Sequence, residues 1–195
     1  MTRHRIPVVV IVLAAVCLLT PFFGEPGRLL LRFDRTGLQS WQLWRLLTAH
    51  LVHLSWGHAL MNVAALALIG EIFRRQMSEA DWAVAALVSA LGVSLGLYLA
   101  TPVDWYVGLS GVLHGILVYG AIRMIRQGIR FGWLIVVVVA GKVVVEQTVG
   151  PVPYTAAVAG GPVVVDAHQY GAIAGGVAIA LKRLAQRLIS TRPAA

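Results

Sequence analysis

The chain has 195 residues, of which 58% are hydrophobic and 12% are charged, and its mean hydropathy is +0.80. A soluble domain carries about 25% charged residues, so this composition excludes a soluble globular protein and indicates a helical membrane protein. The net charge of +8 does not point to nucleic acid, because the basic residues cluster beside apolar segments, as membrane topology requires. The chain contains no glycine-rich phosphate loop, no zinc-type Cys/His spacing and no aromatic-basic stripe that would bind nucleic acid.

A helix that spans a bilayer needs about 20 largely apolar residues. Six segments approach this length and predict an all-α bundle that forms a single domain over residues 1–195. Their approximate limits are 6–23, 57–73, 82–100, 109–127, 131–149 and 167–189. The first segment has no clear small-x-small cleavage site, so we expect it to be retained rather than removed as a signal peptide.

Two connections are too long to be plain hairpins. Residues 24–56 contain Trp41, Trp44 and Trp56 among scattered charges. Because tryptophan favours the membrane–water interface, we expect this connection to lie partly in the outer leaflet. Residues 149–166 contain Gly and Pro throughout, which predicts a flexible loop and a candidate gate.

The basic residues predict an orientation. Eleven of the sixteen Lys and Arg residues fall in the N-terminus, the connections after the second and fourth segments, and the C-terminal tail. Four fall in the connection 24–56, and none in 101–108 or 150–166. The positive-inside rule therefore places both termini in the cytoplasm. The second, fourth and sixth segments then all begin at the outer face.

Ser110 begins the fourth segment, in the motif GLSG that starts at Gly108. The first N–H groups of a helix lack intrahelical partners, and with the helix dipole they can stabilise an oxyanion. The alternative is that Ser110 caps the helix and that Gly108 and Gly111 serve helix packing.

His168 begins the sixth segment, in the motif AHQYG. A neutral imidazole can accept a serine proton and return it to a leaving amine. Gly171 follows one turn later, and we expect it to pack closely against Gly111 and so bring the imidazole within hydrogen-bond reach of Ser110. The alternative is an interfacial histidine that faces lipid headgroups.

His58 and Asn62 are four residues apart and share a helix face. An asparagine amide can donate to an oxyanion without carrying charge, and the histidine can assist. The alternative is a polar clamp between helices, which is the more frequent use of such pairs.

Three further ionisable side chains lie within the apolar segments. His114 follows Ser110 by one turn on the same face, and we expect it to support His168 or to hydrogen-bond another helix. Lys142 and Glu146 are four residues apart, and charges at this depth should pair rather than face lipid. We interpret them as a structural pair, with a proton relay as the alternative.

The three motifs occur in an order that resembles the rhomboid family of intramembrane serine proteases. The family pattern is HxxxN, GxSG and AHxxG in the second, fourth and sixth helices, and the Trp44-Arg45 pair also matches. The resemblance implies Ser110 as the nucleophile and His168 as its base and acid, in a dyad without a third acid. It also implies an oxyanion hole formed by His58, Asn62 and the Ser110 backbone N–H, with no metal or cofactor.

The extended motif GLSGVLHG resembles the rhombosortase branch, because His114 occupies a position that is often tyrosine in rhomboids. This resemblance implies a multi-pass protein of the bacterial inner membrane. Its implied substrates are single-span membrane proteins with C-terminal GlyGly-type sorting tails, cut near the outer face.

Two other functions remain open at this point. One is a rhomboid-like pseudoprotease that binds membrane clients without cleaving them, although such proteins typically lack the serine or the histidine. The other is a membrane cytochrome or metal carrier that uses His58, His114 and His168, which would leave GLSG and Asn62 unexplained.

Overall fold

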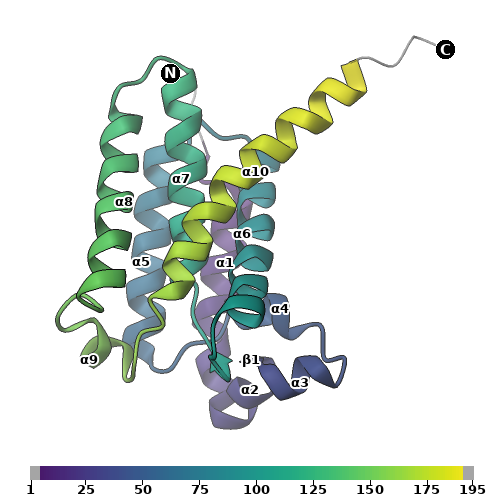
Figure 1. Cartoon of the computed structure of the whole chain (residues 1–195), viewed down its shortest axis with the longest axis vertical. Coiled ribbons are helices and arrows are strands. Elements are labelled where there is room, and N and C mark those ends of the chain that lie inside the picture. Colours follow the sequence, from purple (N-terminus) through teal and green to yellow (C-terminus); the bar gives the residue numbers. More distant parts are fainter. Residues whose placement is uncertain (1–4, 191–195) are drawn as a thin grey trace.

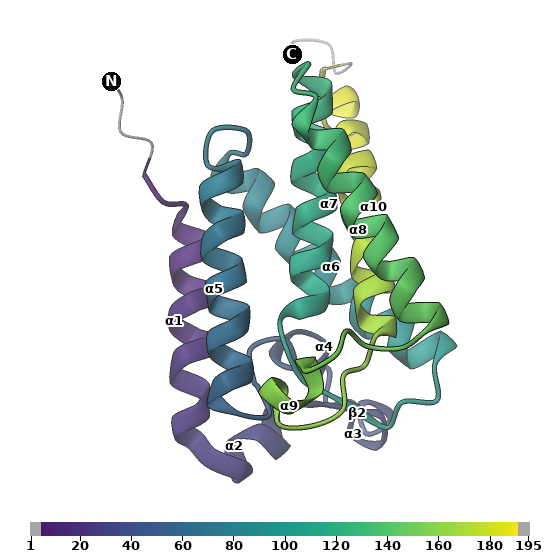
Figure 2. The same ribbon diagram turned by 90° about the vertical axis from the view of Figure 1, so that its left-hand side faces the viewer.

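The computed structural model describes residues 5–190, with side chains up to residue 188, and is built mainly of helices that run along one long axis (Figures 1 and 2). Six long helices coincide with the six predicted segments, in most cases to within three residues. They are α1 (Val8–Leu19), α5 (Trp56–Phe73), α6 (Glu79–Ala100), α7 (Ser110–Arg126), α8 (Phe131–Thr148) and α10 (Asp166–Ser190). The first segment ends differently, since α1 gives way to a 3-10 helix, η1 (Thr20–Phe23).

Four stretches of the described chain are long and apolar enough to cross a membrane: Val8–Leu31, Trp56–Phe73, Glu79–Ala100 and Phe131–Thr148. Helix α7 has 17 residues, ten of them buried, and a helix surrounded by protein does not need an apolar surface. Helix α10 is longer, but Lys182, Arg183 and Arg187 lie near its end. The prediction of a helical membrane protein is confirmed, whereas the number of six spans stays a prediction.

Glycines allow α7 and α10 to touch backbone to backbone. A Cβ built on Gly171 would lie 1.8 Å from the carbonyl oxygen of Gly111, and one built on Gly175 would lie 2.1 Å from that of Gly115. No other residue fits at either position without separating the helices. The expected packing of the sixth segment on the fourth is therefore present, and it sets how closely the N-terminal ends of the two helices approach.

The connection 24–56 is folded rather than extended. It contains α2 (Gly24–Leu31), β1 (Phe33–Asp34), α3 (Arg35–Gln39) and α4 (Arg45–Thr48), which gather at one end of the bundle (Figures 1 and 2).

Two arginines hold this connection in place. The buried Arg45 donates from Nη1 to the carbonyls of Leu29 and Arg32, both at 2.8 Å. Arg35 donates to four carbonyls at and beyond the end of α6, including that of Thr101 at 2.6 Å. These bonds satisfy carbonyls that a helix end leaves without partners.

A two-residue antiparallel pairing joins the same connection to the chain before α7. Phe33 of β1 lies opposite Tyr106 of β2 (Trp105–Tyr106). The start of α7 is therefore anchored from outside its own helix.

The segment predicted as a flexible loop at 149–166 contains a short helix, α9 (Thr155–Ala159), so that prediction was wrong for these residues. Its sequence, TAAVA, favours a helical turn, and Gly160 ends it with a positive φ of 78°. The Ser55 hydroxyl donates to the carbonyls of Ala159 (3.0 Å) and Val158 (3.2 Å), which ties α9 to the start of α5.

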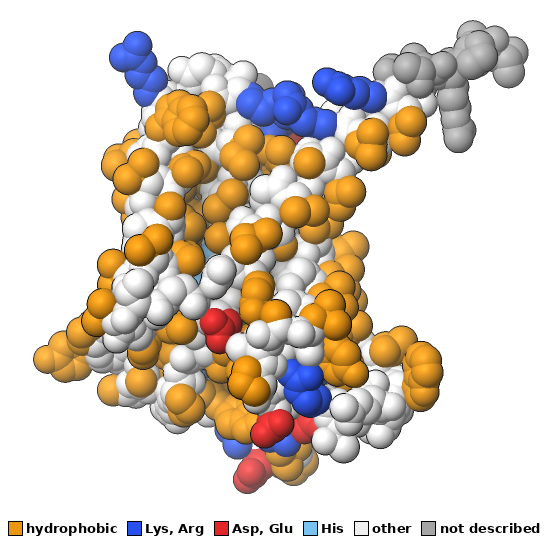
Figure 3. All heavy atoms as spheres, in the orientation of Figure 1, with side chains coloured by type: hydrophobic (Ala, Val, Ile, Leu, Met, Phe, Trp, Pro, Cys, Tyr) orange, Lys and Arg blue, Asp and Glu red, His pale blue; other side chains and the backbone are white. Residues whose placement is uncertain are grey.

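Charged side chains gather at the two ends of the molecule, and hydrophobic side chains cover the flanks between them (Figure 3). At the end that carries the α7–α8 connection, the buried Asp81 accepts from Lys182 (2.6 Å) and Tyr119 (2.5 Å) and pairs with Arg123 at 3.7 Å. This network ties α6, α7 and α10 together. Arg3 and Arg192, which contribute to the predicted orientation, lie outside the described residues, and the orientation itself stays a prediction.

Candidate active site

Ser110 and His168 lie at the first turns of α7 and α10 and face each other. The Nε2 atom of His168 is 2.9 Å from Oγ of Ser110, although 58 residues separate them in the chain. The His168 side chain is almost fully buried. The close contact between Gly111, which directly follows Ser110, and Gly171, one turn after His168, is what permits this distance.

The turn that precedes Ser110 is held by two hydrogen bonds to Gly108. Gly108 has a φ of +123°, a conformation that side-chain-bearing residues rarely adopt. Its N–H donates to the carbonyl of Ala49 (3.0 Å), and its own carbonyl accepts from the Tyr106 hydroxyl (2.7 Å). A Cβ at Gly108 would also meet the His58 ring at 2.8 Å. Glycine is therefore required here both for the turn and for the approach of His58.

A cavity of about 440 Å³ lies in front of this pair and is lined mostly by apolar side chains. The candidate residues Ser110, His168, His58, Asn62 and His114 all line it. Thr155 and Ala159 of α9 and residues 162–164 close another side. The structure thus brings together, around one cavity, five side chains that come from three separate sequence motifs.

His58 and Asn62 lie on the face of α5 that borders the cavity. Asn62 is buried, and its amide donates to the carbonyl of His58 at 3.2 Å. This bond stays within α5, which does not support the alternative of a clamp between helices. An asparagine amide has two N–H donors, so one hydrogen remains for another acceptor.

His114 occupies the position that the sequence placed one turn after Ser110. Its Nδ1 atom is 2.7 Å from the Ser110 carbonyl, so this nitrogen carries the hydrogen. Its ring stacks on that of His168, with centroids 4.3 Å apart and planes 17° apart. The stacking agrees with the expected support of His168, whereas the hydrogen bond lies within α7 and not, as the alternative had it, to another helix.

Glu146 is the site residue that sequence reasoning missed. Its Oε2 atom lies 2.7 Å from Nδ1 of His168, on the side of the ring away from Ser110. Its Oε1 atom lies 2.6 Å from Nζ of Lys142, the pairing expected from the sequence. The available signal was the presence of an ionisable pair at membrane depth, which usually marks a functional site.

The two histidines that precede α5 belong to the surrounding framework. Burial lowers the pKa of His50 to about 4, and its Nε2 atom lies 2.9 Å from the carbonyl of Ala90. Burial and the neighbouring His58 lower the pKa of His53 to about 3, and the His53 ring meets that of His58 edge-on at 4.9 Å. Both rings are therefore neutral near pH 7.

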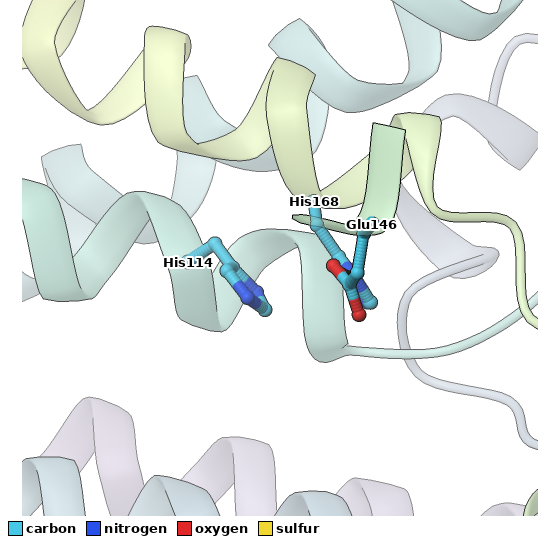
Figure 4. Close-up of side chains that lie close together, drawn as sticks. All are labelled: His114, Glu146 and His168. Atoms are coloured by element: carbon cyan, nitrogen blue, oxygen red, sulfur yellow. Dashed lines mark hydrogen bonds and ion pairs between the residues drawn. The ribbon is translucent and has the colours of Figure 1, made fainter. Parts of the chain in front are cut away.

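His114, Glu146 and His168 offer potential ligand atoms within 4.8 Å of one another (Figure 4). A metal ion needs ligand atoms that converge on it at about 2 Å. The lone pairs of two stacked imidazoles point along nearly parallel planes, and both nitrogens of His168 already have partners. The same stacking leaves no space for a haem between the rings, so the arrangement fits neither a metal nor a haem.

The fold and the site together define a class: a helical membrane protein with a serine–histidine pair facing a cavity. A family model described as the rhomboid domain matches residues 40–185, about three quarters of the chain. The chain therefore belongs to the rhomboid family and is an integral membrane protein.

One curated relative supports this assignment. The Bacillus subtilis (strain 168) protein named "Putative rhomboid protease YdcA" is 28% identical over 117 residues, which cover 56% of this chain and 59% of that protein. The chain thus matches less than two thirds of its relative's length.

Proposed function

We propose that the protein is an intramembrane serine endopeptidase in which Ser110 is the nucleophile and His168 is the general base and acid. The observation that carries this proposal is the 2.9 Å contact between Oγ and Nε2 at the wall of the cavity. An intact pair at this distance disfavours a pseudoprotease. The family supports a role within the bilayer, on membrane-protein substrates.

In this mechanism His168 takes the hydroxyl proton as Ser110 attacks the scissile carbonyl, and it returns that proton to the leaving amine. His168 then takes a proton from water as the water attacks the acyl-enzyme, and it returns that proton to Oγ of Ser110 as the acid product leaves. The free N–H of Asn62, the backbone N–H at the start of α7 and the His58 ring stabilise the oxyanion. Gly108 and Gly111 hold the nucleophile, and His114 and Gly171 support the base.

The proposed substrates are single-span membrane proteins cut near the outer face, with access past α8 and residues 149–166. Unwinding a substrate helix in lipid costs free energy, because the exposed backbone groups have no hydrogen-bond partners. Glycine near the cut lowers this cost, because it weakens the helix. The resemblance of GLSGVLHG to rhombosortases and this argument both favour C-terminal GlyGly-type tails. The proposed location is the bacterial inner membrane, with both termini in the cytoplasm.

The test is labelling of the purified protein with a fluorophosphonate probe. Wild type should label, whereas Ser110→Ala and His168→Ala should not. Ser89→Ala is the matched control, because Ser89 is a fully buried membrane-helix serine without a hydrogen-bond partner, and it should label like wild type. Folded wild type that fails to label in several detergents and lipids would favour client binding without cleavage.

A further inference from the structure

The side of His168 that faces away from Ser110 is bound to an acid. Glu146 comes from the last turns of α8 and His168 from the first turn of α10 (Figure 4). Their side chains are only 2% and 6% exposed, and the Oε2–Nδ1 distance is 2.7 Å. This contact lies within the hydrogen-bonding range of about 2.7–3.2 Å.

This contact determines which nitrogen of His168 carries the hydrogen. An ionised carboxylate can only accept, so at this distance Nδ1 must be the donor. A neutral ring has one hydrogen, and Nε2 therefore presents its lone pair to the Ser110 hydroxyl. That is the tautomer a general base needs.

Lys142 favours the same tautomer of His168, with the hydrogen on Nδ1. Its Nζ atom lies 2.6 Å from Oε1 of Glu146 but 3.3 Å from Nδ1 of His168. Since the Nδ1 hydrogen is directed at the carboxylate, Lys142 is a neighbouring cation of the ring rather than its donor. A buried carboxylate needs such a partner to stay ionised.

We propose that Glu146 is a positioning residue that fixes the tautomer and orientation of His168, and that Lys142 keeps this acid ionised. The site is then a serine–histidine–glutamate arrangement rather than the two-residue dyad implied by the family resemblance. This inference rests on the proposed function, because it assigns Glu146 a role in the chemistry of Ser110.

The first test replaces Glu146 with Gln, which keeps the shape but removes the charge. We expect kcat and the rate of fluorophosphonate labelling to fall by about 10²- to 10⁴-fold, which is the contribution of general acid–base catalysis; neutralising the acid behind a catalytic histidine costs about 10⁴-fold in serine proteases. KM should change little, since Glu146 faces the base. Glu146→Asp, which retains the charge, should recover part of the lost rate.

The matched control is Asp81→Asn. Asp81 is another buried carboxylate that is bonded to a lysine, but it does not line the cavity. Its loss should lower the melting temperature and leave the labelling rate per folded molecule unchanged. A purely structural Glu146 would behave in the same way.

If Glu146→Gln does not fold, a second variant, Lys142→Met, tests the proposal. Lys142→Met leaves the buried carboxylate without its cation, which favours the neutral acid, and a neutral Glu146 no longer holds His168 in the state that a base needs. The rate should therefore fall at pH 7 and recover as the pH is raised. The titratable groups that face His168 are His114 from α7, Lys142 and Glu146 from α8, and His58 across the cavity.

The outcomes separate this inference from the proposed function. If wild type labels and folded Glu146→Gln labels at the same rate, the role of Glu146 is refuted while Ser110 remains the nucleophile. A Lys142→Met protein with wild-type rates at every pH refutes the role of Lys142. If wild type itself neither labels nor cleaves, the proposed function has failed before Glu146 is tested.

Discussion

The contact between α7 and α10 leads to a prediction whose size follows from the structure. In Gly171→Ala the new Cβ would lie 1.8 Å from the Gly111 carbonyl oxygen, whereas ordinary contact begins at 3.4 Å. The helices must therefore separate by about 1.6 Å at this point. Overpacking of this kind destabilises proteins by about 1–3 kcal/mol.

The same displacement reaches the site, because His168 lies one turn from Gly171. Moving α10 away would lengthen the 2.9 Å contact between Nε2 and Oγ beyond hydrogen-bonding distance. A misplacement of about 1 Å is enough to slow a reaction by about 100-fold. We therefore expect Gly171→Ala to lose about two orders of magnitude in labelling rate and to unfold at a lower temperature.

The control is Gly176→Ala in the same helix, where a Cβ would meet nothing within 4 Å. Alanine is the better helix former, so this variant should be as stable as wild type or more stable by up to about 1 kcal/mol. The assay compares melting temperature and fluorophosphonate labelling of both variants in one detergent. If Gly171→Ala has the same melting temperature and the same labelling rate as Gly176→Ala, close packing of α7 on α10 does not set the geometry of the site.

Three further outcomes can be measured. Asn62→Ala should lower kcat by about 10²- to 10³-fold with little change in melting temperature, as expected when an oxyanion donor is removed; unchanged kcat would count against that role. His114→Tyr should keep measurable activity, because an aromatic ring can still stack on His168, and complete loss in a folded protein would indicate direct chemistry. The pKa of His50, lowered by burial from 6.5 to about 4, means that the unfolded chain takes up a proton between these values and the folded protein does not. Stability should therefore fall by about 3 kcal/mol as the pH drops from 6.5 to 4; His50→Gln should flatten the melting temperature over this range, and an unchanged slope would contradict the assignment.

The long helices could be predicted because each is encoded locally. Runs of apolar residues between Gly, Pro and charged clusters define them, and the structure agrees to within a few residues. The short helix α9 and the folded connection 24–56 could not be predicted in this way. Their stability comes from residues that are distant in the sequence. Ser55 holds α9, and the carbonyl of Thr101 holds Arg35 of the connection 24–56.

The site residues divide in the same way, into those that a local pattern marks and one that only a distant contact reveals. Ser110, His168, His58 and Asn62 could be singled out because each is a polar residue in an apolar segment, at a helix start or at helical spacing. Glu146 was interpreted only through Lys142, its neighbour four residues away. Its bond to His168 spans 22 residues and depends on how α8 and α10 dock, which no local pattern specifies.

The Glu146–His168 bond constrains how a substrate can reach Ser110. Helix α8 packs mainly against α7 and touches α10 at few points. The Glu146–His168 bond is a direct polar link from α8 to α10. An access route that displaced the end of α8 would break it and release the base from its tautomer. Substrate access past α8 is therefore compatible with the proposed role of Glu146 only if α8 returns before Ser110 attacks. A disulfide that locks α8 in place would then slow binding, whereas loss of Glu146 would slow the chemical step.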